Sequence, residues 1–133
     1  MPAARKSKSS EILQSEVEDG STLFVLFIPS KTKDGEDLPS GQDQQMWANA
    51  AGKLLAEEFG GATEMPPAKG MWSNDDGKII QEKIILVHSY AKMIDAQNEE
   101  KIARLARFLH RMGKMTKQGE VGVVIDSIFF SNS

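Results

Sequence analysis

Three side chains able to take part in acid–base chemistry stand at even-numbered positions of one apolar segment, KIIQEKIILVHSYA (78–91). Glu82, His88 and Tyr90 supply a carboxylate, an imidazole and a phenol, and a regular strand places all three on one face. On an apolar wall, these groups could bind a ligand or move a proton. We favour a more ordinary interpretation. In it, Glu82 is exposed near a turn, and His88 and Tyr90 lie at the end of the strand with their polar atoms in contact with water.

Trp72 could join such a site, depending on the turn that follows it, SNDDG (73–77). A two-residue turn at Asp76 and Gly77 would pair Trp72 with Gln81 and point it away from Glu82. A loop with an odd number of residues would bring Trp72 and Glu82 to the same face. An ordinary core or interface aromatic remains the favoured interpretation of Trp72.

Asp126 interrupts the apolar segment EVGVVIDSIFF (120–130). Because a buried, unpaired carboxylate is costly, Asp126 either faces solvent on an edge strand or pairs with Glu82 for acid–base work or to hold a cation. The two histidines lack metal-ligand spacing, so we expect no metal, and we expect no cofactor. No catalytic residue is assigned, and the candidate ligand-binding residues are Trp72, Glu82, His88, Tyr90 and Asp126.

A basic stripe lies at helical spacing in the segment 95–118, formed by Arg104, Arg107, Arg111 and Lys114. Such a stripe could contact phosphates, but it is more often the solvated back of an amphipathic helix. The aromatic motif with which ferredoxin-like RNA binders stack bases is missing from KIIQEKIILV. Nucleic acid therefore ranks below a protein partner.

The composition indicates one ordinary domain: 133 residues, 40% hydrophobic and 26% charged, with a net charge of -3 and no cysteine. Residues 1–20 are polar and predict a flexible tail, without the apolar centre of a secretory signal. No segment has the apolar length of a transmembrane helix. We therefore expect a soluble cytoplasmic protein without a membrane partner.

The order of elements predicts a ferredoxin-like α+β fold, βαββαβ, with two helices on one face of an antiparallel sheet. The single domain spans 21–133. Pro66 and Pro67 cannot donate to a sheet ladder, which places the second strand at an edge. The expected strands are 21–30, 62–72, 78–91 and 120–130, and the expected helices are 43–61 and 95–118.

The first and third strands are apolar on both faces, as central strands covered on both sides are. Helices cover only one face in this fold, so we expect something to cover the other. Self-association through this open face is our first choice, as in the dimeric α+β barrels. A bound apolar ligand or the tail 1–20 is the alternative.

A pattern in the middle third of the chain resembles a group of small bacterial proteins of unknown function. It consists of F-G-G-x-T at 59–63, G-x-W at 70–72 and D-G-x(4)-E at 76–82. The resemblance implies a compact bacterial domain and carries no activity with it.

The leading hypothesis is a non-enzymatic, self-associating module that binds a protein partner or a small ligand. The first alternative is a cofactor-independent small enzyme, similar to dimeric α+β barrel enzymes, with Glu82, His88 and Tyr90 in an apolar pocket. The second alternative is nucleic-acid binding through the basic second helix.

Overall fold

The computed structural model describes residues 21–128, so the expected tail 1–20 lies outside the described residues. The sheet order is β2-β4-β1-β5 with antiparallel pairing, and β3 pairs with β4 beyond β2. The first and third expected strands are central, which confirms the ferredoxin-like arrangement. The elements are β1 (Ser21–Ile28), α2 (Gln44–Phe59), β2 (Thr63–Glu64), β3 (Ala68–Ser73), β4 (Ile79–Lys92), α3 (Met93–Ala96), α4 (Glu99–Met115) and β5 (Val123–Ile128).

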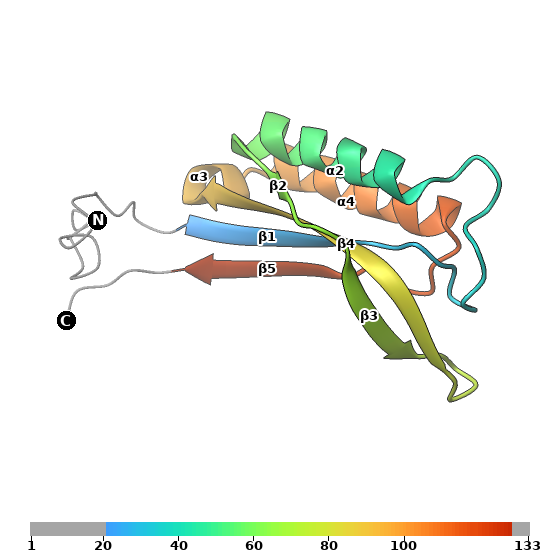
Figure 1. Cartoon of the computed structure of the whole chain (residues 1–133). Helices are drawn as coiled ribbons and strands as arrows, with labels where there is room; N and C mark the ends of the chain where they lie inside the picture. Colours follow the sequence, from blue (N-terminus) through green and yellow to red (C-terminus); the bar gives the residue numbers. More distant parts are fainter. Residues whose placement is uncertain (1–20, 129–133) are drawn as a thin grey trace, which may run out of the picture.

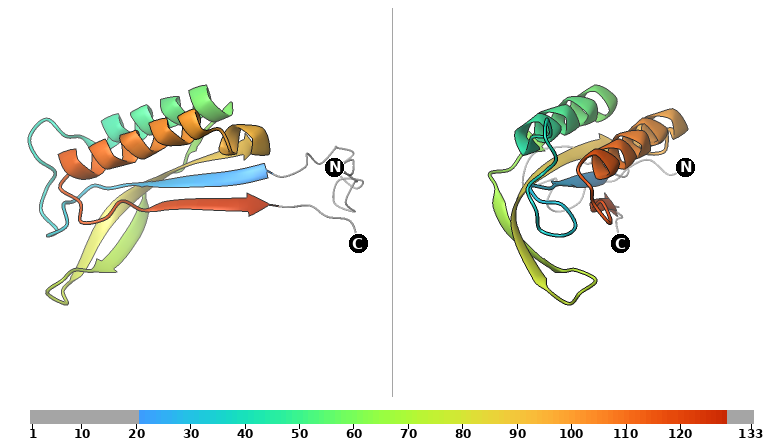
Figure 2. Two further views of the ribbon diagram at one scale, coloured as in Figure 1. Left: turned by 180° about the vertical axis from the view of Figure 1, so that it is seen from behind. Right: turned by 90° about the vertical axis from the view of Figure 1, so that its right-hand side faces the viewer.

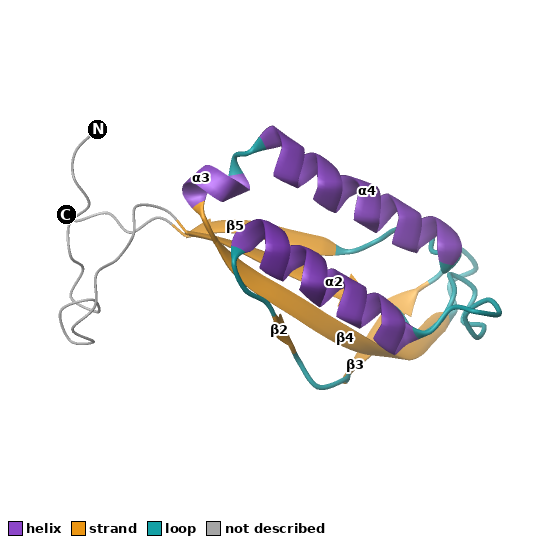
Figure 3. Cartoon of the chain, turned by 90° about the horizontal axis from the view of Figure 1, so that it is seen from above, coloured by secondary structure: helices purple, strands orange, loops and turns teal. Residues whose placement is uncertain are grey.

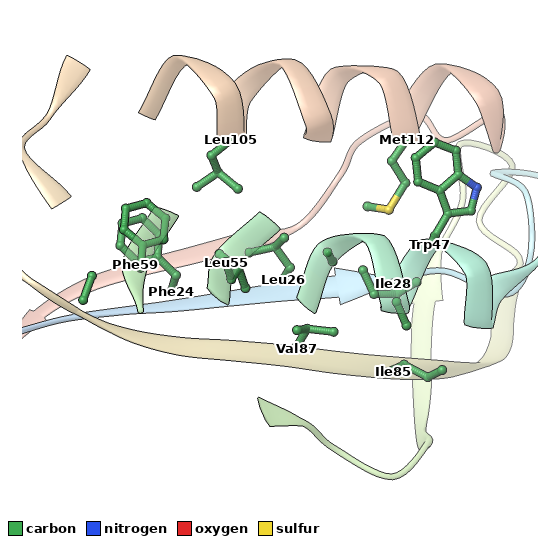
Figure 4. Packing of buried hydrophobic residues seen from close by; sticks show 13 residues of the cluster. Phe24, Leu26, Ile28, Trp47, Leu55, Phe59, Ile85, Val87, Leu105 and Met112 are labelled. Atoms are coloured by element: carbon green, nitrogen blue, oxygen red, sulfur yellow. The ribbon is translucent and has the colours of Figure 1, made fainter. Parts of the chain in front are cut away.

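Both long helices cover the same face of the sheet (Figures 1 and 3). Between the helices and the sheet lies the apolar core, in which the rings of Phe24 and Phe59 stack with their centroids 4.5 Å apart (Figure 4). Burying such large apolar side chains is the main source of stability in a domain of this size. The largest core residues are Phe24, Leu26, Ile28, Trp47, Leu55, Phe59, Ile85, Val87, Leu105 and Met112.

The first helix begins close to its expected start, whereas the second begins at Glu99, after the separate short helix α3 and later than expected. The Asp43 side chain accepts a hydrogen bond from the N–H of Gln45 at the start of α2, and Asn98 accepts one from Lys101 at the start of α4. These contacts satisfy N–H groups that have no partner within the helix. Gly60 ends α2 in the left-handed region, with φ of 95°.

Two details differ from the expectation. The second helix ends at Met115, before its expected end at 118, and Gly113 is buried inside it, where an added Cβ would lie 2.6 Å from Cγ2 of Val121. Close packing against the following segment therefore explains this glycine better than a helix end. The second expected strand is split into β2 and β3, because 65–67 contains the two prolines that cannot donate to β4.

The face of the sheet away from the helices is apolar along β1 and along part of β4, where Ile84 and Leu86 are followed by His88 and Tyr90. The alternate residues of β1 that face the helices are buried, and those on the opposite face are half-buried. The register of β1 with β4 places the outward residues of both central strands side by side, with Tyr90 opposite Leu23 and His88 opposite Val25. We call the apolar part of this surface the open face: Leu23, Val25 and Phe27 on β1, and Ile84 and Leu86 on β4.

β4 is longer than its neighbours and continues past the end of β1 into a hairpin with β3. This β3–β4 hairpin bends away from the helix layer toward the side of the open face (Figures 1 and 2). The bend brings the hairpin beside the segments that leave β1 and enter β5, where a groove forms.

Candidate functional site

The loop of the β3–β4 hairpin decides where Trp72 points. Ser73 pairs with Ile79, so the loop 74–78 contains an odd number of residues instead of forming a two-residue turn. The side-chain oxygen of Asn74 accepts from the backbone N–H groups of Asp76 and Lys78, both at 3.0 Å, and stabilises this loop. Trp72 and Glu82 therefore lie on one face of the hairpin.

Glu82 is the centre of the site. Its Oε1 accepts from the indole N–H of Trp72 at 2.9 Å, and its Oε2 accepts from the backbone N–H groups of Ser30 and Lys31, both at 2.9 Å. The Ser30 hydroxyl adds a longer contact to Oε2 at 3.4 Å. The residue is only 8% exposed, against the sequence-based interpretation of an exposed glutamate. Hydrogen bonds from several N–H groups are what a buried carboxylate requires.

The groove beneath the hairpin has a volume of about 870 Å³. Segments far apart in the sequence form it: the end of β1, the loop that follows, the hairpin and the segment before β5. Phe27, Trp72 and Ile84 supply apolar surface, and Glu82 lies in its wall. The lining thus combines apolar side chains with many polar and charged ones, and the groove has the volume of a small-ligand site.

His88 and Tyr90 lie elsewhere. They share the face of β4 that carries Glu82, and their rings are 5.9 Å apart, but Glu82 is six residues away, roughly 20 Å along a strand. They line a second, shallower groove of about 630 Å³ with Gly60 and Gly61 at the end of α2. Glu82 and His88 therefore do not share a pocket.

Asp126 is exposed on the edge strand β5, as one of the two sequence-based interpretations holds. It lies opposite Leu23, whose other neighbour is Tyr90, so two strand spacings, roughly 10 Å, separate Asp126 from Tyr90. Glu82 lies eight residues further along β4 from Tyr90. The structure thus does not bring Asp126 and Glu82 together as a pair.

One of the four basic side chains in the stripe on α4 takes part in ion pairs. Arg104 donates to both carboxylate oxygens of Glu58 on α2, at 3.0 and 2.9 Å, and reaches Glu100 at 3.5 Å. Arg107, Arg111 and Lys114 are exposed, and none of the ion pairs found within 21–128 involves them. A phosphate-binding surface on this helix would therefore have three basic side chains available instead of four.

Sequence reasoning missed two parts of the groove. The backbone N–H groups of Ser30 and Lys31 carry no sequence signal, because any residue except proline supplies such a donor. The start of the loop 31–42 binds Glu82 through the backbone N–H of Lys31. The segment 118–122, which closes the groove opposite the hairpin, gave no signal beyond its two glycines.

Within residues 21–128, no three His, Asp or Glu side chains are placed to hold a metal ion together. No helix in this part of the chain is long and apolar enough to cross a membrane.

No family model and no curated protein matches the chain. Solved structures do. The divalent cation tolerance protein CutA1 from Thermus thermophilus is 12% identical, with 84% of this chain and 87% of that chain covered and a TM-score of 0.52. CutA1 from Oryza sativa is 13% identical over 86% and 85%, with a TM-score of 0.54. A phage SAM lyase in complex with S-methyl-5'-thioadenosine is 11% identical over 86% and 92%, with a TM-score of 0.52. At these identities the likeness shows the fold alone, an α+β ferredoxin-like domain.

Proposed function

We propose that the chain is a self-associating binding protein, in which copies meet through the open face and a small ligand occupies the groove beneath the hairpin. One observation carries the first half: the open face is an apolar patch on the two central strands, bordered by His88 and Tyr90, that no helix covers. When one face of a sheet meets water, each strand usually carries polar side chains on that face, at every second position. A second copy of the chain could cover this face with its own open face, as in a two-fold symmetric dimer.

The groove supports the second half of the proposal. Trp72 is held in place by its bond to Glu82, and Glu82 is held by two backbone N–H groups, so the wall of the groove is rigid before any ligand arrives. A preformed site loses less entropy on binding than a flexible one. The carboxylate oxygens already accept several hydrogen bonds, which favours a binding role for Glu82 over that of a proton acceptor.

The fold does not choose between functions, since one fold supports many. Its solved neighbours are named both as divalent cation tolerance proteins and as a lyase. No specific observation favours an enzyme that uses Glu82, His88 and Tyr90 together, because these side chains divide between two grooves. We propose further that the chain belongs with the small bacterial proteins of the F-G-G-x-T pattern and acts in the cytoplasm.

The oligomeric state tests the proposal. Sedimentation velocity should show the full-length protein as a species larger than its 14.6 kDa chain. Val25→Glu places a charge in the middle of the open face without touching the helix side, and it should give a folded single chain. The matched control is Ala106→Glu, on the exposed surface of α4, which should leave the assembly unchanged. A wild-type protein that sediments as one chain, or a Val25→Glu variant that keeps the wild-type assembly, would contradict self-association through this face.

A further inference from the structure

The groove beneath the hairpin is strongly negative. Its charged lining residues are one lysine, Lys33, and five acids: Asp34, Asp75, Asp76, Glu82 and Glu120. The whole chain carries a net charge of only -3, so negative charge is concentrated here. A concave site lined by charge of one sign attracts ligands of the opposite sign and repels ligands of its own.

None of these five acids takes part in the ion pairs found within 21–128, and Glu82 is the buried one among them. Glu82 is more than nine-tenths buried, and its hydrogen-bond partners are neutral groups: two backbone N–H groups, one hydroxyl and one indole N–H. None of the ion pairs found within 21–128 involves Glu82. A buried carboxylate without a nearby positive charge is electrostatically incomplete, and a cation bound in the groove would complete it.

The apolar side chains of the groove determine what kind of cation it can bind. Phe27, Trp72 and Ile84 line the groove beside Glu82. An indole ring attracts a positive charge held near its face, most strongly where water is excluded. A fully hydrated inorganic ion gains little from such surface, and no three His, Asp or Glu side chains within 21–128 are placed to replace its water.

We propose that the groove binds a small organic cation, with its apolar body on Phe27 and Trp72 and its positive group toward Glu82 and the acidic hairpin loop. The acids at the rim attract the cation, and Trp72 and Glu82 hold it. This inference rests on the ligand-binding half of the proposed function, and it shares Phe27 and Ile84 with the open face.

Benzyltrimethylammonium is a suitable probe, with benzyl alcohol and benzoate as its neutral and anionic counterparts. The chain has two tryptophans, so a ¹⁵N-labelled full-length protein gives two indole N–H signals. The Trp72 indole N–H donates to Glu82, and its signal should move during titration with the cation. The Trp47 indole N–H donates to Gln42 in the core and should stay still, as an internal control. Benzyl alcohol should bind more weakly, and benzoate should leave the Trp72 signal unmoved.

The double variant Asp75→Asn/Asp76→Asn removes two rim charges while keeping the shape of the exposed side chains. It should weaken binding of benzyltrimethylammonium roughly fivefold, as expected for two solvent-exposed charge pairs. The matched control is Glu57→Gln/Glu99→Gln, which changes the net charge equally on α2 and α4, away from the groove. This control should bind the cation as the wild type does.

Three outcomes would overturn the inference. The first is a Trp72 signal that no concentration of benzyltrimethylammonium moves. The second is a shift of equal size with benzyl alcohol, because the charge would then play no part. The third is equal weakening in both double variants, because the total charge of the protein would then be responsible.

The same titration on the Val25→Glu variant separates the two proposals. Cation binding by a single folded chain would support the inference whether or not the wild type self-associates. A wild-type protein that self-associates but leaves the Trp72 signal unmoved would overturn the inference and leave the proposed association intact.

Discussion

The indole N–H of Trp72 donates to Oε1 of Glu82 over 2.9 Å, although the two residues stand on different strands of the hairpin. The other carboxylate oxygen accepts from the backbone of Ser30 and Lys31, just after β1. One side chain therefore connects β3, β4 and the loop after β1. This connection sets the position of the hairpin relative to the sheet, and with it the shape of the groove.

Glu82→Gln should destabilise the protein by about 1–3 kcal/mol, because the amide that replaces one oxygen would face donors instead of accepting from them. Trp72→Phe removes one donor while leaving the others on Glu82, so its cost should be smaller. Urea unfolding of both variants measures the difference. The exposed neighbour Gln81→Ala serves as the control and should change little. If Glu82→Gln unfolds at the urea concentration of the wild type, the carboxylate does not hold the hairpin.

The fold was accessible from sequence because its signals are repeated along the chain. Two strands apolar on both faces had to be central, and Pro66 and Pro67 had to lie at an edge. Asp43 and Gly60 marked the ends of the first helix through local hydrogen bonding and backbone conformation. Each of these inferences depends on short-range chemistry that a sequence displays directly.

The site was harder to predict from the sequence, because it depends on the register in which β3 pairs with β4. A change of one residue in the loop before β4 moves Trp72 to the opposite face, and Asp76-Gly77 alone suggests a shorter turn than the one formed. Asn74 decides the outcome by accepting two backbone hydrogen bonds. The fold also separates Glu82 from His88, since residues on one face of a long strand need not share a pocket.

Gly60→Ala should cost about 1 kcal/mol, because Gly60 has φ of 95°, a conformation that L side chains rarely adopt. The adjacent Gly61→Ala is the matched control. Gly61 has no such φ, and an added Cβ would meet nothing within 4 Å. Thermal or urea unfolding of the two variants compares them directly. Equal stabilities would contradict the role of Gly60 as the residue that ends α2.

Arg104 and Glu58 should show a coupling free energy of about 0.5–1 kcal/mol in a double-mutant cycle, because the pair joins α4 to α2 through two hydrogen bonds and Glu58 is mostly buried. Arg104→Ala, Glu58→Ala and the double variant are compared by urea unfolding. The exposed neighbour Arg107→Ala should show no coupling to Glu58→Ala. A coupling indistinguishable from zero at Arg104 would leave this residue free to join a phosphate-binding stripe.

The same helix offers a test of the nucleic-acid alternative. We expect the full-length protein to show no binding of DNA or RNA with the steep salt dependence that many phosphate contacts produce. Fluorescence anisotropy with labelled oligonucleotides at two salt concentrations measures this, beside the triple variant Arg107→Ala/Arg111→Ala/Lys114→Ala. Binding that falls steeply with salt and is lost in the triple variant would favour the nucleic-acid function over the one proposed.

Asp37 should titrate below its ordinary pKa, because Lys31 Nζ donates to its Oδ1 over 2.6 Å and attracts the carboxylate. A pKa lowered in the folded state contributes stability above the unfolded pKa, and this contribution is lost as pH falls through the folded value. Side-chain carbon NMR measures the pKa of Asp37 directly. Lys31→Met should raise that pKa, whereas Lys33→Met, in the same loop, should leave it unchanged. An Asp37 that titrates identically in the wild type and in Lys31→Met would show that the ion pair is not formed in solution.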